Sequence, residues 1–378
     1  MDVESKRHTA ILWYTHHHPG FLQKKSSPNI AVKCNIDATL LRHLASLGTG
    51  FDCASVEEMR AVLNLGIDPA RILFANPCKA AASLVFARRA GVFKTTFDNI
   101  DELDNIKRHM PEAQLLLRIY ANDDSAVIGL GEKFGAPADT TFALLARAWE
   151  LGLDVIGVSF HVGMFYHFTT SFTCTWLMRK GTGARDPKSF CKAIQDARLV
   201  FAQAQQLGFK PTILDIGGGF QDETFDHMAS VIRESIRAEF QDGVIAIAEP
   251  GRFYARSAYT LVCRVIARRK QIGSAVADGV PDMLYQNDGV YGNFMNVILE
   301  KEVVSPQAIS LDEANYIHRE TKNKTGEFRY SIWGPTCDSV DCVVREASFN
   351  REVRVGDYLK YENMGGEYHD LLSMTLLI

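Results

Sequence analysis

Short apolar runs alternate with helical patterns over the first two thirds of the chain. Eight runs rich in β-branched and other apolar residues follow one another, each of a length typical of a buried strand. The segments between them repeat apolar residues at i, i+3 and i+4, as amphipathic helices do. This alternation predicts a (β/α)8 barrel of parallel strands. The predicted strands span residues 29–35, 48–55, 71–77, 92–99, 114–121, 155–163, 212–219 and 244–252.

The pattern changes after about Tyr254. The later apolar runs have no helical segments between them, which is typical of an antiparallel sheet. We therefore expect an α/β chain with two domains. The first is a (β/α)8 barrel over residues 10–254, and the second is a C-terminal antiparallel β domain over residues 255–378.

Composition and charge narrow the function classes. Hydrophobic residues make up 47% and charged residues 23% of the chain, which is ample for a folded core. A net charge of −4 provides no basic field for a nucleic acid or an anionic membrane. No apolar stretch approaches the roughly 18 to 20 residues of a membrane span, and the cysteines and histidines lack zinc spacing. We expect a cytoplasmic, metal-free enzyme that acts on a small molecule.

Polar residues close the predicted barrel strands at their C-terminal ends, where barrel enzymes carry their active sites. Lys33 ends a predicted buried strand and could form a Schiff base with a carbonyl compound. The run Gly217–Gly219 exposes backbone N–H groups that suit a phosphate, and Glu249 could pair with a pyridinium nitrogen. Each feature alone also fits a strand end or a loop. Together they predict a pyridoxal 5'-phosphate (PLP) site.

Ten motifs cover nearly the whole chain in order: AVKCN (31–35), FDCAS (51–55), ANPCK (75–79), LLRI (116–119), GVSFHVG (157–163), LDIGGGF (214–220), AEPGRFY (248–254), NDGVYGNF (287–294), WGPTCDSVD (333–341) and YENMG (361–365). They closely resemble the eukaryotic ornithine decarboxylases, which have an alanine-racemase-like fold. The resemblance implies PLP-dependent decarboxylation of L-ornithine to putrescine and CO2. It also implies a homodimer with active sites at the subunit interface, and antizyme as a further partner.

The resemblance assigns roles to individual residues. Lys33 would bind the cofactor aldehyde, His161 would stack on the cofactor ring, and Glu249 would hold the pyridinium. From the other subunit, Cys337 would protonate the carbon that loses CO2, and Asp338 would bind the distal ammonium of the substrate. Glu58 matches a position close to Lys33. Further cofactor contacts would come from Asp52, Arg118, Gly217, Gly218, Gly219, Gly251 and Arg252.

Three segments depart from the family pattern. Residues 164–181 form an aromatic and Thr-rich insert, either a lid or a translated intron, and leave Thr182 in place of a phosphate-binding serine. The β domain resembles one truncated at its C-terminus, where Tyr368 would replace the family's phosphate-contacting tyrosine. The family's acidic substrate contact falls on Glu300 without a gap, or on Lys301 if one residue is inserted.

Two alternative functions stay open. One is a related diamino-acid decarboxylase of a specialised alkaloid or other secondary-metabolite pathway. The other is an inactive homologue similar to the antizyme inhibitors. An alanine-racemase-type enzyme is disfavoured, because Cys337 stands where that chemistry needs a tyrosine acid/base.

Overall fold

The computed structural model describes residues 28–121, 133–162, 187–220, 222, 224–240, 244–273, 279–309 and 328–366. The described residues divide into two compact units, the first ending at Tyr254 and the second beginning at Ala255. The predicted domain limits of 10–254 and 255–378 stay predictions, because their outer ends lie outside the described residues. The insert 164–181, Thr182 and Tyr368 lie outside them as well.

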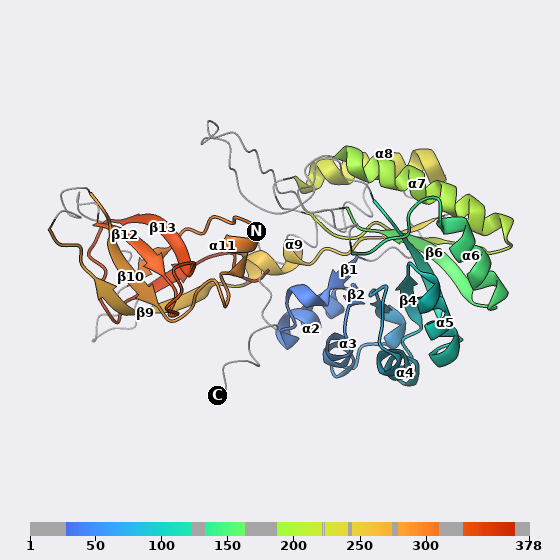
Figure 1. Ribbon diagram of the computed structural model, residues 1–378, viewed down its shortest axis with the longest axis horizontal. Helices are drawn as coiled ribbons and strands as arrows, with labels where there is room; N and C mark the ends of the chain where they lie inside the picture. Colours follow the sequence, from blue (N-terminus) through green and yellow to red (C-terminus); the bar gives the residue numbers. More distant parts are fainter. Residues whose placement is uncertain are drawn as a thin grey trace. The chain divides into compact units, whose positions relative to one another are not determined.

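The first unit contains an eight-stranded parallel sheet whose strands pair in sequence order (Figure 1). The N–H of Asn29 donates to the carbonyl of Ala248 at 2.9 Å, which links the first strand to the residue after the last. The predicted barrel class is thereby confirmed. Its strands are β1 (Asn29–Ala31), β2 (Gly50–Cys53), β3 (Ile72–Phe74), β4 (Lys94–Phe97), β5 (Gln114–Ile119), β6 (Asp154–Phe160), β7 (Ile213–Asp215) and β8 (Ile245–Ile247).

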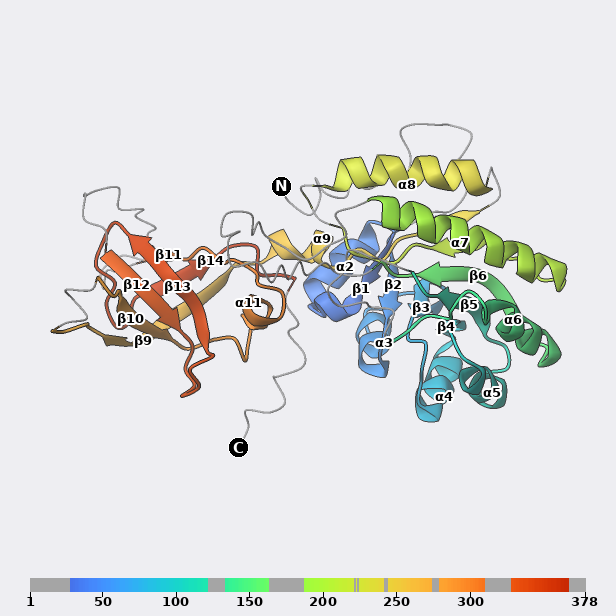
Figure 2. The ribbon, with the colours of Figure 1, turned by 45° about the horizontal axis from the view of Figure 1, so that its top comes forward.

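Helices surround these strands, with α7 and α8 side by side on one flank (Figures 1 and 2). Their apolar faces are buried, as the helical periodicity predicts. No helix of the described ranges is long and apolar enough to cross a membrane. The helices are α2 (Ala38–Ser46), α3 (Val56–Leu63), α4 (Ala81–Ala90), α5 (Ile100–His109), α6 (Thr141–Glu150), α7 (Pro187–Gln206) and α8 (Phe225–Phe240).

Side-chain caps turn the chain from a strand end into the following helix. After β2, the Ser55 hydroxyl accepts the N–H of Glu58 at 3.2 Å, and the Glu58 carboxylate accepts the N–H of Ala54 at 2.9 Å. These two bonds resemble a capping box: one satisfies the N–H of Glu58 in the first turn of α3, and the other satisfies the N–H of Ala54, just before the N-cap Ser55. The side chains of Asp37 and Asn99 also accept N–H groups from the first turns of α2 and α5. The caps fix where each strand ends, and therefore where the residues of the rim lie.

The second unit holds a six-stranded sheet in the order β11-β14-β9-β10-β12-β13. The predicted antiparallel pattern needs one refinement, because β10 and β12 pair in parallel. A parallel pair requires a long crossover connection, and the chain from Gln286 to Phe328 provides it. The elements are β9 (Leu261–Arg269), β10 (Asp282–Gln286), α11 (Met295–Leu299), β11 (Gln307–Ile309), β12 (Phe328–Trp333), β13 (Cys342–Phe349) and β14 (Tyr358–Tyr361).

Candidate active site

Five polar side chains gather at the C-terminal ends of the barrel strands. Lys33 follows β1 in a short 3-10 turn, Asp52 lies in β2, and Arg118 lies in β5. His161 and Glu249 follow β6 and β8. These groups lie close enough to change one another's pKa values: Glu249, Lys33 and Arg118 all act on Asp52. The structure therefore brings the predicted barrel residues to one rim, as the parallel strand order requires.

Lys33 differs from its sequence-based description. The strand ends at Ala31, and Lys33 is exposed rather than buried. The 3-10 turn Val32–Cys34 explains the difference, because it carries the chain out of the sheet one residue before the lysine. Lys33 thus stands on the rim of the barrel instead of inside a strand, a position from which a lysine can meet a carbonyl compound.

Two carboxyl groups of the site, those of Asp52 and Glu249, have raised pKa values because they are buried. Burial raises the pKa of Glu249 well above its ordinary value, and the neighbouring Asp215 raises it further. Burial also raises the pKa of Asp52, with a smaller contribution from Glu249. Oδ1 of Asp52 and Oε1 of Glu249 are buried, and neither accepts a hydrogen bond from a described donor. Buried oxygens without donors are rare in folded proteins, so they indicate that a polar molecule binds here.

His161 is neutral in this environment. Burial lowers its pKa to about 3, and the positive charges of Lys33 and Arg118 act in the same direction. Its Nε2 accepts the N–H of Gly218 at 3.3 Å and lies 4.0 Å from Oε2 of Glu249. Since the ring is uncharged and the pKa of Glu249 is raised, this last contact is not an ion pair. A neutral aromatic ring beside the buried carboxyl suits stacking on a flat ligand.

Three glycines let backbone approach the site closely. A Cβ on Gly217 would lie 2.6 Å from the Phe160 carbonyl, and one on Gly218 would lie 2.7 Å from the Glu249 carbonyl. Gly217 and Gly219 have φ values of 67° and 92°, which other residues rarely adopt. Gly251 leads into α9 (Arg252–Ala255), which Arg252 begins. The N–H groups of Gly217 and Gly218 donate to Asp215 and His161, so within this run the N–H of Gly219 suits a phosphate, together with the segment that Gly251 and Arg252 begin.

Cys337 and Asp338 lie in the turn between β12 and β13 of the second unit, and both are exposed. The hydroxyl of Tyr291 and the N–H of Val340 donate to the Asp338 carboxylate. The hydrogen bond from Tyr291 is the main reason that the pKa of Asp338 is lowered. A carboxylate held in its ionised form can pair with an ammonium group.

One buried carboxylate fixes the turn that carries Cys337. Asp341 accepts the N–H of Val290 at 2.8 Å, and it accepts the Thr336 hydroxyl at 2.7 Å. A Cβ on Gly289 or on Gly334 would lie 2.2 Å from the same carboxylate. These contacts join the NDGVYG and WGPTCDSVD segments, which explains why both motifs contain glycine at these positions.

Glu300 also lies in the second unit and ends α11. The residue is 9% exposed, and its backbone N–H donates to the Asn296 carbonyl at 2.9 Å. Lys301 follows with a φ of 54°, an uncommon conformation for a lysine. The joining of Cys337, Asp338 and Glu300 with the barrel rim in one site stays a prediction.

Sequence reasoning missed Asp215, the last residue of β7. It is 1% exposed, and its Oδ1 accepts the N–H of Gly217 at 3.0 Å. Its carboxyl group lies close enough to that of Glu249 for each to change the pKa of the other. The available signal was an acidic residue inside an apolar run of the motif LDIGGG.

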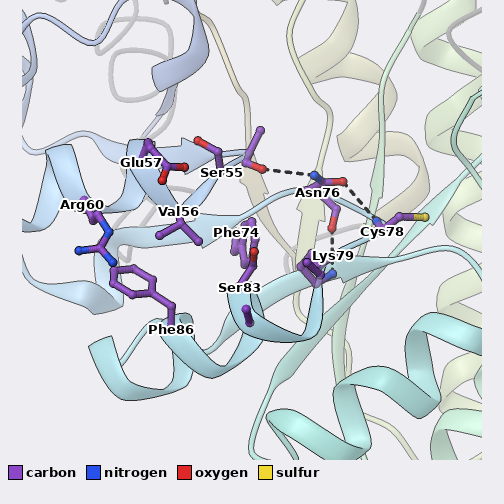
Figure 3. A pocket seen from close by; sticks show the side chains of 13 residues that line it. Ser55, Val56, Glu57, Arg60, Phe74, Asn76, Cys78, Lys79, Ser83 and Phe86 are labelled. Carbon is purple, nitrogen blue, oxygen red and sulfur yellow. Dashed lines mark hydrogen bonds between the residues drawn. The ribbon is translucent and has the colours of Figure 1, made fainter. Parts of the chain in front are cut away.

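A second feature missed from the sequence is a buried ion pair near a pocket. The pocket has a volume of about 420 Å³ and lies between α3, α4 and the loops before them (Figure 3). Lys79 lines it, and its Nζ lies 2.8 Å from Oε1 of Glu102. Arg60 stacks over the Phe86 ring at 4.5 Å on the same wall. None of the described residues that line this pocket belongs to the predicted cofactor set.

A PLP-binding barrel protein is the class that these features define together. They are the parallel barrel, Lys33 on its rim, the buried carboxyl groups of Asp52 and Glu249, and the glycine run Gly217–Gly219. Two family models agree with this class. The pyridoxal-binding domain of the pyridoxal-dependent decarboxylases matches residues 14–173, and their C-terminal sheet domain matches residues 138–365. The chain belongs to this family, and its cofactor is PLP. The family, the fold class and the cofactor expected from the sequence are confirmed.

Individual relatives agree with the assignment. The ornithine decarboxylase of Neurospora crassa is 43% identical over 362 residues, a match covering 89% of this chain and 71% of the relative. Decarboxylase flvG of Aspergillus flavus is 42% identical over 347 residues, covering 92% and 76%. The crystal structure of an arginine decarboxylase from Paramecium bursaria Chlorella virus superimposes with a TM-score of 0.81 at 33% identity. That match covers 97% of this chain and 88% of the viral one.

The neutral state of His161 predicts a pH-dependent stability. As pH falls from 6.5 toward 3, the unfolded chain binds a proton that the native imidazole does not, so stability is lost on acidification. Between pH 7.5 and 4.5, the free energy of unfolding of the cofactor-free protein should fall by about 2 kcal/mol more than that of His161→Asn. Urea unfolding at both pH values measures this. Asp215, whose pKa is raised to about 6, acts in the opposite direction but is present in both proteins. Equal losses would contradict a neutral His161.

Proposed function

We propose that this protein decarboxylates L-ornithine to putrescine and CO2 as a cytoplasmic homodimer, with antizyme as a regulatory partner. The observation that carries the proposal is the pair Cys337 and Asp338 in a PLP-dependent decarboxylase. The carboxylate is held ionised by Tyr291, and Cys337 is the residue before it in the same turn. Relatives named ornithine decarboxylase, at 40–43% identity, support the choice of substrate.

The barrel residues would hold the cofactor. Lys33 would bind its aldehyde, Glu249 its ring nitrogen, and Gly217–Gly219 with Gly251 and Arg252 its phosphate. His161 would cover a face of the ring without adding charge, because it is neutral. Bound PLP supplies a sink for the electrons that remain on the substrate when CO2 leaves. Asp52 and Arg118 would complete the rim around it.

The second unit would supply the substrate contacts, from the partner subunit of the dimer. The Asp338 carboxylate would bind the distal ammonium of ornithine, which would otherwise be left unpaired on binding. Glu300 would add a second carboxylate. The Cys337 thiol would give its proton to the carbon that has lost CO2, so that hydrogen replaces the carboxylate in the product.

Substrate comparison tests the proposal. The protein loaded with PLP should release CO2 from ornithine with a higher kcat/KM than from lysine or arginine. Asp338→Asn should raise the KM for ornithine about 10- to 100-fold, because a charged hydrogen bond is lost. Glu346→Gln, on the exposed face of β13 next to Arg329, is the matched control and should leave KM unchanged.

Two outcomes would redirect the proposal. Preference for another diamino acid would favour a specialised decarboxylase, an alternative supported by the similarity to flvG and to amino acid decarboxylase lolD2 of Epichloe uncinata, which is 38% identical. PLP binding without turnover of any of the three amino acids, combined with tight antizyme binding, would favour an inactive regulator.

A further inference from the structure

Two carboxyl groups meet at the ends of adjacent barrel strands. Asp215 ends β7, where its register partner is Ile247 of β8, and Glu249 follows two residues later. Both residues are buried, at 1% and 6% exposure. The Gly217 carbonyl accepts the N–H of Glu249 at 2.7 Å, while the N–H of Gly217 donates to Oδ1 of Asp215 at 3.0 Å. One glycine therefore fixes both acidic residues through its backbone.

The contact between these carboxyl groups requires a proton. Each side chain acts on the pKa of the other as a hydrogen-bond partner, yet an ionised carboxylate has only acceptor oxygens. A hydrogen bond between them therefore needs one of the two groups to be protonated and to donate. Burial raises the pKa of both groups and favours retention of that proton. The other charges that act on the pair come from Asp52, Lys33 and Arg118.

We propose that Asp215 is a positioning residue: it holds Glu249 through a shared proton, so that an oxygen of Glu249 faces the pyridinium nitrogen of PLP. A carboxyl group has two oxygens and needs only one for Asp215, and no described donor reaches Oε1 of Glu249. The neutral ring of His161, 4.0 Å from Oε2, limits rotation of the carboxyl on its other side. The inference rests on the role of Glu249 in the proposed function, but not on the choice of substrate.

A purely structural role for Asp215 is the competing explanation, because its Oδ1 also fixes the turn at Gly217. The variant Asp215→Asn distinguishes the positioning role from the purely structural role. Asp215→Asn keeps an oxygen for the Gly217 N–H and supplies an amide donor for Glu249. Asp215→Ala removes both contacts.

The test is a double-mutant cycle on PLP binding to the cofactor-free full chain, measured by titration calorimetry. Asp215→Ala should weaken the Kd for PLP about 10- to 100-fold, as removal of an orienting partner does at metal sites. Asp215→Asn should stay within about threefold of wild type. In a Glu249→Ala background, Asp215→Ala should have almost no further effect, because a positioning residue acts only through the group that it holds.

Three results would overturn the inference. They are additive losses in the cycle, an Asp215→Asn variant that binds PLP as poorly as Asp215→Ala, or an Asp215→Ala variant that binds as well as wild type. The conservative Asp215→Asn keeps the test open should the alanine variant fail to fold. Since PLP binding is measured without ornithine, failure of the proposed substrate would leave this result unaffected.

Discussion

Replacing Lys79 by methionine is expected to lower the free energy of unfolding by about 3–5 kcal/mol, because it leaves a buried carboxylate without its partner. The Lys79 side chain is fully buried, and Glu102 is 5% exposed. Besides the ion pair, Nζ donates to the carbonyls of Asn76 and Thr96 at 2.8 and 2.7 Å. All three partners would lose their donor together. Equilibrium unfolding in urea measures the change.

The double variant Lys79→Met with Glu102→Leu tests the cause. Removing both charges abolishes the unpaired carboxylate, so most of the lost stability should return. Arg88→Met is the matched control, because it breaks the exposed pair with Glu112 and should cost less than about 1 kcal/mol. A single Lys79→Met variant as stable as wild type, or a double variant less stable than the single one, would contradict this account.

Cys337→Ala is expected to reduce kcat for ornithine by about 10²–10⁴-fold, the range found when a general acid is removed. Its KM should change little, because the ammonium contact belongs to Asp338. The turn that carries Cys337 is fixed by Asp341 through Thr336, so the alanine should leave the backbone in place. Steady-state release of CO2 gives both constants.

Cys342→Ala is the control for this variant. Cys342 begins β13 in the same hairpin, opposite Trp333, and is half-buried. It should keep full activity. Mixing Lys33→Ala with Cys337→Ala protein should restore part of the activity, since one site of a hybrid dimer would hold both intact residues. Loss of activity in Cys342→Ala alone, or no recovery on mixing, would contradict the proposed role and the shared site.

Local pattern predicts the barrel well because its strands and helices follow one another along the chain. The runs around Ile72, Val158 and Ile245 all fall in strands, since each is apolar, short and flanked by helical periodicity. The polar ends of those runs correctly indicate the rim. The parallel pairing of β10 with β12 lies beyond such reasoning, because it depends on the path of a long connection.

The two missed features have a different physical cause. Asp215 lies at the end of an apolar run, where the sequence pattern indicates only the end of a strand. Its proximity to Glu249 becomes visible only in the folded structure. In the sequence, Lys79 and Glu102 fall in separate segments with helical periodicity and resemble ordinary surface charges of amphipathic helices. Only the packing of α5 against the loop before α4 makes them a buried pair. The roles of Asp215 and of the Lys79–Glu102 pair depend on residues that are distant in the sequence and meet only in the folded protein.

The shared anchor at Asp341 has a consequence for how substrate preference could change. Its carboxylate ties the turn of Cys337 to Val290, a few residues before α11 and Glu300. The Cys337 thiol that would complete the reaction and the segment that would contact the far end of the substrate are therefore both held in place through Asp341. With Glu300 as the proposed substrate contact, substitutions within 293–300 would reshape the far end of the binding site while the thiol stays where it is. A lineage could thus acquire a longer or shorter diamino acid without rebuilding its chemistry.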